Sequence, residues 1–198
     1  MKDITCLHTL TRVCNVDKIG KNKAVAAKRI DDMQKKVFQL LVDNTAGVLS
    51  RISGLFSRRG YNIESITAGV TADPRFTRIT IVTSGDDDIL EQIEKQVAKL
   101  VDIRVIKELK PEESVYRELA LIKVAVKADR RQGVISMADI FRAKIIDVSA
   151  DSMIIELTGD QSKIEAFINL LEGYEILELA RTGIAGLTRG SEDVTYLS

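Results

Sequence analysis

Residues 37–65, VFQLLVDNTAGVLSRISGLFSRRGYNIES, change their hydrophobic period along the chain and thereby decide the fold. Val37–Val42 is a short apolar run that favours a buried strand, and Asp43–Gly47 interrupts it with turn-forming residues. From Val48 the apolar residues recur at helical spacing, and Gly60 ends this pattern. Tyr61–Ile63 then leads into a further strand. The stretch therefore predicts a strand, a tight polar loop, an amphipathic helix and the start of a second strand.

The polar loop has the chemistry of a site for a small anion. A loop that opens a helix leaves unpaired backbone N–H groups at the positive end of the helix dipole, and this arrangement attracts a carboxylate. Gly47 allows a ligand to approach the backbone, and the amide of Asn44 can accept from an ammonium group or donate to a carboxylate. A free amino acid meets these demands. The simpler interpretation is an ordinary strand–helix loop with a glycine near the helix N-cap.

Three motifs resemble a known family. They are DNTAGVLSRISGLFSRRGYNIES from Asp43, DPRFTRITI from Asp73 and ARTGIAGLTRG from Ala180. Together they resemble the small, regulatory subunit of acetolactate synthase over about Lys36 to Arg189. That subunit begins with an ACT domain, a βαββαβ module that binds amino acids. The fold class expected is therefore α+β, with two ferredoxin-like βαββαβ domains in tandem, an ACT domain followed by an ACT-like domain.

The resemblance also implies a function and a partner. A member of this family has no catalytic site of its own; it activates a separate catalytic subunit and makes it sensitive to feedback by valine or related branched-chain amino acids. The family's chemistry, thiamine diphosphate, magnesium and any FAD belong to that catalytic (large) subunit. Two ACT domains are expected to pair as a homodimer, with the effector between chains. The effector-binding residues expected on this basis are Asn44, Ala46, Gly47, Val48 and Leu49 of one chain with Asn62 and Ile63 of the other.

The composition is that of an ordinary folded protein. The chain has 198 residues, 45% of them hydrophobic and 29% charged, and its formal net charge is zero. Nothing in this balance favours a nucleic-acid partner or an anionic membrane surface. No apolar run approaches the roughly 20 residues needed to cross a bilayer, and no signal peptide is visible. We expect a cytoplasmic protein.

Downstream of the first helix, the pattern completes one βαββαβ unit. Strands are expected over 62–71, 76–83 and 102–109, with a turn at Ala72-Asp73-Pro74. The acidic run that ends at Asp88 is expected to cap a second helix, whose apolar stripe starts at Ile89. The first strand carries apolar residues on both faces, and the two helices of such a unit can cover only one face. We expect a second copy of the chain to cover the other.

The second half repeats this order loosely. Strands are expected over 119–126, 145–149, 153–158 and 176–180, with helices marked by Val134 to Phe141 and by Ile164 to Leu171. Asp129–Gly133 takes the place of the first polar loop, but Arg130 stands where that loop has Asn44. We expect no amino-acid site here. Arg130 and Arg131 either contact the catalytic subunit or belong to a solvated face, and residues 182–190 are expected to form a glycine-spaced loop without the context of a phosphate site.

These observations divide the chain. We expect a flexible N-terminal extension over 1–35, an ACT domain over 36–109, a linker over 110–114, an ACT-like domain over 115–190 and a frayed tail over 191–198. Cys6, His8 and Cys14 lie in the extension, and three such residues without a fourth are weak evidence for a metal site. Both cysteines lie there, so no disulfide framework is expected.

Alternative functions follow from the same fold. A stand-alone ACT-type amino-acid sensor that controls another enzyme or a transcription factor is the main alternative, although the sequence contains no helix-turn-helix or basic reading element. An enzyme with an unrecognised site is the other. The single histidine, His8, lies outside the expected domains, and no nucleotide-binding glycine motif or catalytic triad can be assembled.

Overall fold

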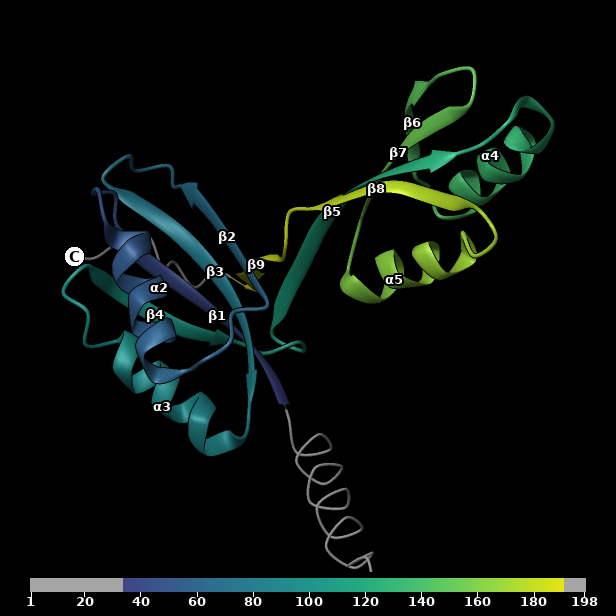
Figure 1. Ribbon diagram of the computed structural model, residues 1–198. Helices are drawn as coiled ribbons and strands as arrows, with labels where there is room; N and C mark the ends of the chain where they lie inside the picture. The colour runs from purple at the N-terminus through teal and green to yellow at the C-terminus, as the bar shows by residue number, and fades with distance from the viewer. Residues whose placement is uncertain (1–33, 191–198) are drawn as a thin grey trace, which may run out of the picture. The chain divides into compact units, whose positions relative to one another are not determined.

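The structure is a computed structural model that describes residues 34–190 (Figure 1). The first six elements are β1 (Gln34–Asp43), α2 (Val48–Arg59), β2 (Ser65–Val70), β3 (Phe76–Gly85), α3 (Asp87–Val97) and β4 (Ile103–Leu109). Eight more follow: β5 (Ser114–Ala125), the 3-10 turn η1 (Ala128–Arg130), α4 (Arg131–Ile140), β6 (Lys144–Val148), β7 (Ser152–Gly159), α5 (Gln161–Leu170), β8 (Glu175–Arg181) and β9 (Ala185–Thr188). The order of strands and helices confirms two βαββαβ units in tandem.

The first unit is an antiparallel sheet in the order β2-β3-β1-β4 with α2 and α3 packed on one face. The register pairs Phe38 with Ile81 and Leu40 with Ile79, so these four side chains point to the same face and are buried. The apolar stripe of α2, which includes Ile52 and is predicted from its helical spacing, packs against them. The expected helix is therefore confirmed, because its stripe and the alternation in β1 meet in one core.

Both helices of this unit begin and end where the local chemistry predicts. Gly60 ends α2 in the left-handed conformation with φ 70°, a region open to glycine at little cost. The Asp86 side chain accepts a hydrogen bond from the Ile89 N–H at 2.8 Å and caps α3. These contacts fix the position of each helix over the sheet.

The other face of the first sheet is covered in part by the same chain. Ile184, just before β9, packs with Val37, Val82 and Leu109. The Gln39 side chain, buried on this face, donates from Nε2 to the Gly186 carbonyl at 2.8 Å. The expectation that only a second copy would cover this face is therefore wrong in part, because the chain itself returns here. The prediction of an irregular loop over residues 182–190 is also wrong, since Ala185–Thr188 forms β9 and pairs with the start of β5.

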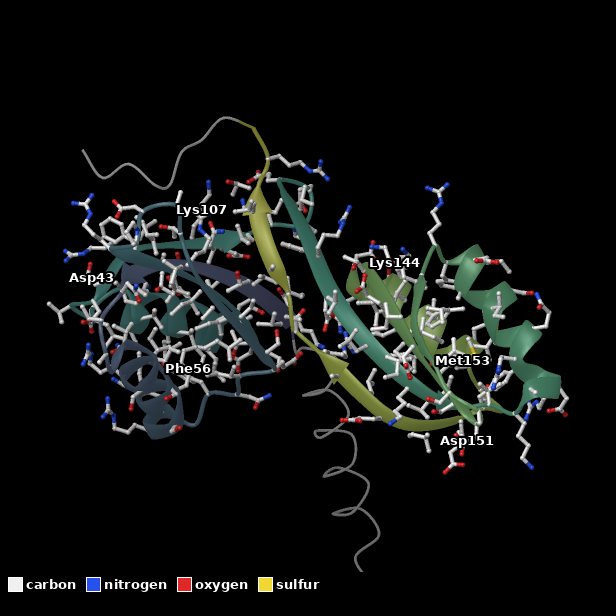
Figure 2. The ribbon with its side chains drawn as sticks, turned by 90° about the horizontal axis from the view of Figure 1, so that it is seen from above. Asp43, Phe56, Lys107, Lys144, Asp151 and Met153 are labelled. Atoms are coloured by element: carbon white, nitrogen blue, oxygen red, sulfur yellow. The ribbon has the colours of Figure 1, made fainter. Side chains whose placement is uncertain are left out.

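The second unit is an antiparallel sheet in the order β6-β7-β5-β8, with its own core. Ile122 of β5 pairs with Ile155 of β7, and Phe167 of α5 lies fully buried against this face. Phe56 and Met153, labelled in Figure 2, belong to the two separate cores. Strand β5 begins at Ser114, five residues before the sequence predicts, because its first residues pair with β9.

Some expectations fall outside the described residues. Residues 1–33 and 191–198 lie beyond them, so the extension, the tail and the weak metal signal at Cys6, His8 and Cys14 stay predictions. Within residues 34–190, no helix has the length and apolar character needed to span a membrane.

Candidate functional site

The polar loop between β1 and α2 encloses a cavity of about 250 Å³. Asn44, Ala46, Gly47, Val48 and Leu49, all expected from the sequence, line this cavity. Asp43 and Thr45 from the loop, Val42 from β1 and Thr77 and Ile79 from β3 complete its wall. The loop thus lines a concave surface at the start of α2.

Backbone geometry leaves this helix start open to a ligand. Gly47 is the N-cap of α2 with φ 89°, a value that side-chain-bearing residues rarely adopt, and no side chain caps the helix at this point. Within the loop, the Asp43, Asn44 and Thr45 N–H groups donate to backbone acceptors, at Asp102 (3.0 Å), Arg75 (2.7 Å) and Asp43 (2.9 Å) respectively. The first turn of α2 also contains no acidic residue. Its N–H groups and the positive end of its dipole are therefore available to a carboxylate from outside.

The Asn44 amide has a structural role in addition to the one expected. Its Nδ2 donates to the Pro74 carbonyl at 2.9 Å, and its Oδ1 accepts from the Thr77 hydroxyl at 3.1 Å. Asn44 therefore fastens the loop to β3 and to the turn before it. One N–H and one lone pair of the amide stay available for a ligand.

Two bidentate ion pairs lie at the rim of the cavity. Arg104 donates to Asp43 at 2.7 and 2.6 Å, and Arg51 donates to Asp102 at 2.5 and 2.7 Å. The hydrogen bonds from Arg104 lower the pKa of the Asp43 carboxyl below its usual value, and the bonds to Asp102 raise the pKa of Arg51. Because each charge has a partner, the helix start supplies the uncompensated positive field in the cavity.

Asn62 and Ile63 do not line this cavity. They lie in the segment before β2, where the Asn62 carbonyl accepts from the Thr83 hydroxyl at 2.6 Å and its side chain is exposed. Ile63 is half-buried against the first core. Strand β2 is at the edge of its sheet and pairs only with β3 among the described residues. The predicted site can therefore combine all its residues only if a second copy brings its own Asn62 to the cavity.

Sequence reasoning missed Thr77, Ile79 and Arg51. The first two come from β3, where Thr77 pairs with Val42 and so faces the loop. This pairing follows from the antiparallel order once the register is fixed, but the register depends on contacts that a single sequence does not display. Arg51 follows Gly47 by one helical turn, and its Nη1 lies 3.0 Å from the position of a Cβ built on Gly47.

The loop before α4 differs from the loop before α2. Gly133, expected to match Gly47, lies inside α4 rather than at a left-handed N-cap. The Arg131 side chain donates to the Ser149 and Ala150 carbonyls, both at 2.7 Å, and holds the β6–β7 turn. Arg130 lies over the Tyr174 ring at 4.4 Å. These contacts give both arginines a structural role, which favours the solvated-face interpretation over contact with a partner.

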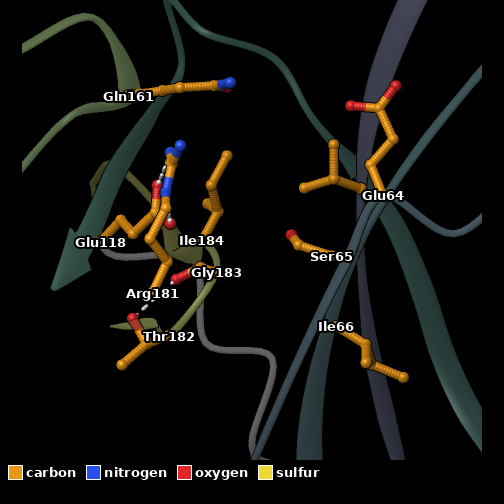
Figure 3. Close-up of a pocket in the computed structure, with 10 residues that line it drawn as sticks. Glu64, Ser65, Ile66, Glu118, Gln161, Arg181, Thr182, Gly183 and Ile184 are labelled. Carbon is orange, nitrogen blue, oxygen red and sulfur yellow. Dashed lines mark hydrogen bonds and ion pairs between the residues drawn. The ribbon is translucent and has the colours of Figure 1, made fainter. Parts of the chain in front are cut away.

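A second cavity, of about 370 Å³, is lined by Glu64 and Ser65 before and at the start of β2 and by residues of β5 and β8 (Figure 3). In its wall Arg181 donates to Glu118 through two bonds of 2.7 Å, and these bonds raise the pKa of Arg181. None of the predicted effector residues lines this cavity. Among residues 34–190 there is also no group of three or more histidine, cysteine or acidic side chains placed to hold a metal ion.

The tandem βαββαβ fold defines a class of protein, the ACT-domain proteins. Residues 38–107 match the model of the AHAS small subunit-like ACT domain, and residues 117–190 match the small subunit of acetolactate synthase. The chain belongs to the family of acetolactate synthase small subunits.

Individual relatives support this assignment. The probable acetolactate synthase small subunit of Archaeoglobus fulgidus is 48% identical over 158 residues, which are 80% of this chain and 99% of the relative. The acetolactate synthase small subunit of Mycobacterium leprae is 44% identical over 78% of this chain and 92% of its own length. The crystal structure of the Thermotoga maritima small subunit matches with a TM-score of 0.74 and 45% identity, covering 80% of this chain and 99% of that one.

Proposed function

We propose that this chain is a regulatory subunit that activates a separate thiamine-diphosphate-dependent catalytic subunit and confers feedback inhibition by valine or a related branched-chain amino acid. The observation that carries the proposal is the cavity at the start of α2, whose backbone donors are uncapped and whose wall includes the apolar residues Val48, Leu49 and Ile79. Together with membership of the family, this cavity supports an effector with a carboxylate and a short aliphatic side chain.

The residues of the cavity suggest how the effector binds. Its carboxylate accepts from the N–H groups that follow Gly47, and Gly47 provides the close approach to the backbone. Its aliphatic side chain packs against Val48, Leu49 and Ile79. The remaining lone pair of the Asn44 amide accepts from the ammonium group.

A homodimer completes this site. The exposed outer edge of β2 offers unpaired backbone groups on which a second copy adds by strand pairing. Such pairing brings Asn62 and Ile63 of the second copy toward the cavity of the first. Binding of the effector then depends on the dimer geometry, and this dependence links the site to the activity of a partner.

In this proposal the catalytic subunit carries out the reaction, and this chain does not. The catalytic subunit holds thiamine diphosphate, magnesium and any FAD, while this chain supplies the effector site and the contacts that raise activity. The isolated chain is therefore expected to convert no pyruvate.

Reconstitution tests the proposal directly. Purified chain is mixed with the catalytic subunit and pyruvate, with and without valine, and acetolactate formation is followed. We expect no turnover by the chain alone, a rise in the activity of the catalytic subunit when it is added, and loss of that rise with valine. Valine binding without any effect on the catalytic subunit would instead indicate a stand-alone sensor, and turnover by the chain alone would indicate an enzyme.

Replacing Asn62 by alanine tests the contribution of the second copy. We expect valine affinity to fall by about 1–3 kcal/mol, the usual cost when a polar group in a closed site loses its hydrogen-bond partner. Calorimetry measures this change, with Asn169→Ala on the exposed face of α5 as the matched control. Unchanged affinity in Asn62→Ala would remove Asn62 from the site.

A further inference from the structure

A third cavity lies on the face of the first sheet that carries no helix. It has a volume of about 620 Å³ and is formed by β2 and β3 on one side and by β9 and the start of β5 on the other. Pockets for small molecules commonly have about 300–1,000 Å³. The cavity does not share a residue with the effector site at the start of α2. It is therefore a separate candidate for a ligand.

Many of the residues that line this third cavity are apolar or have small side chains. Ala68, Val115 and Ala185 lie in its wall, and two large apolar side chains beside it are largely exposed, Val70 at 61% and Leu187 at 53%. Apolar side chains that are exposed to water are stabilised when an aliphatic group packs against them. The wall therefore suits a ligand with an apolar body.

The charge in the cavity has one sign. Arg78 and Arg117 line it and no acidic residue does. The Nε of Arg78 is buried without a hydrogen-bond partner, and Arg78 has no ion pair among residues 34–190. By contrast, Arg51 and Arg104 each donate two hydrogen bonds to a carboxylate. An unsatisfied donor of a charged group is costly to bury, so an anion that accepts from Arg78 would stabilise the groove.

The register explains why this groove has room. Arg78 of β3 pairs with Gly69 of β2, which has no side chain to fill the space beside it. A Cβ added at Gly69 would meet no atom within 4 Å. The strand edge thus leaves an open channel next to the unpaired guanidinium.

We propose that this cavity binds a small aliphatic monocarboxylate, with its carboxylate on Arg78 and its hydrocarbon body between Val70 and Leu187. An amino acid does not fit the cavity equally well, because the lining has no acidic group to accept its ammonium. The charged lining also disfavours a neutral hydrocarbon, which would leave the Arg78 donor unsatisfied. The proposal rests on the lining of this cavity and not on the proposed regulation.

Octanoate is the probe for the test, with octylamine and octanol as cationic and neutral analogues of equal chain length. Titration of the full chain is followed by calorimetry and by the NMR signal of the Arg78 Nε–H. We expect octanoate to bind, to move that signal and to bind at least about tenfold more tightly than octanol, as a charge-assisted hydrogen bond implies.

Two variants make the test specific. Arg78→Gln is expected to weaken octanoate binding by at least about tenfold, while the matched control Arg58→Gln, on an exposed turn of α2, leaves it unchanged. Gly69→Val fills the channel and is expected to remove binding without a change of charge. Circular dichroism reports that each variant is folded, and valine affinity is measured on the same samples.

Other results would overturn the proposal. Equal binding of octanoate and octanol, or an unchanged Arg78 signal, would show that no carboxylate site exists. A signal that moves with protein concentration rather than with octanoate would show that a second copy of the chain occupies the groove. Since valine binding is measured on the same samples, failure here is distinct from failure of the regulatory function.

Discussion

Replacing Gly47 by leucine is expected to weaken inhibition by valine by at least about 100-fold, equivalent to about 2.8 kcal/mol of binding free energy. A side chain at this position enters the space that the effector carboxylate needs, and its Cβ lies 3.0 Å from Arg51 Nη1. Activation of the catalytic subunit is expected to persist, because residues 44–47 are exposed and belong to neither core. Dose–response curves for valine, measured on the reconstituted enzyme, give the result.

Gly60→Leu is the matched control for this variant. Gly60 also has a positive φ, 70°, so an L side chain there carries a comparable backbone strain of about 1–2 kcal/mol. A Cβ at Gly60 meets no atom within 4 Å and lies at the opposite end of α2 from the cavity. If both variants lost valine inhibition equally, strain rather than occlusion would be the cause, and the assignment of the cavity would be wrong.

Replacing Arg181 by leucine is expected to lower the free energy of unfolding by about 3 kcal/mol, the cost of leaving a buried carboxylate without its partner. The Glu118 side chain is 4% exposed, and both of its oxygens accept from Arg181. Denaturant titration of the two variants Arg181→Leu and Arg104→Leu measures the free energy of unfolding of each. It shows whether the loss depends on how deeply the remaining carboxylate is buried. Arg104 makes the same bidentate contact with Asp43, which is 24% exposed, so its removal is expected to cost at most about 1 kcal/mol.

A double variant tests the reason for this difference. Glu118→Gln combined with Arg181→Leu removes the buried charge together with its partner, and most of the lost stability is expected to return. If Arg181→Leu unfolded no more readily than Arg104→Leu, solvent would have to reach Glu118, and the cavity wall would be more open than its geometry indicates.

The sequence predicts the first unit well because its local signals agree with one another. The change of period at Val48, the glycine at Gly60 and the cap at Asp86 each depend on residues a few positions apart. The cavity residues from Asn44 to Leu49 follow from the same loop. Their expected role as an effector site rests on the glycine and the helix start of this loop together with the family resemblance.

The errors all concern long-range contacts. Strand β9 has four residues, one of them glycine, and little intrinsic preference for a strand; its stability comes from pairing with β5 and from the bond between Gln39 and Gly186, 147 residues apart. Gly133 resembled a loop glycine, but its neighbours Val134 and Ala138 are buried in the second core, and this burial extends the helix across it.

The return of the C-terminal segment to the first sheet has a consequence for biosynthesis. A ribosome that has made the first βαββαβ unit has not yet made Ile184 or β9, so Val37, Val82 and Leu109 face water until the last part of the chain emerges. The nascent protein thus exposes an apolar sheet face throughout translation of its second half. A chain shortened before Ile184 would retain that exposure permanently and would be prone to aggregate, even with every residue of the effector loop in place.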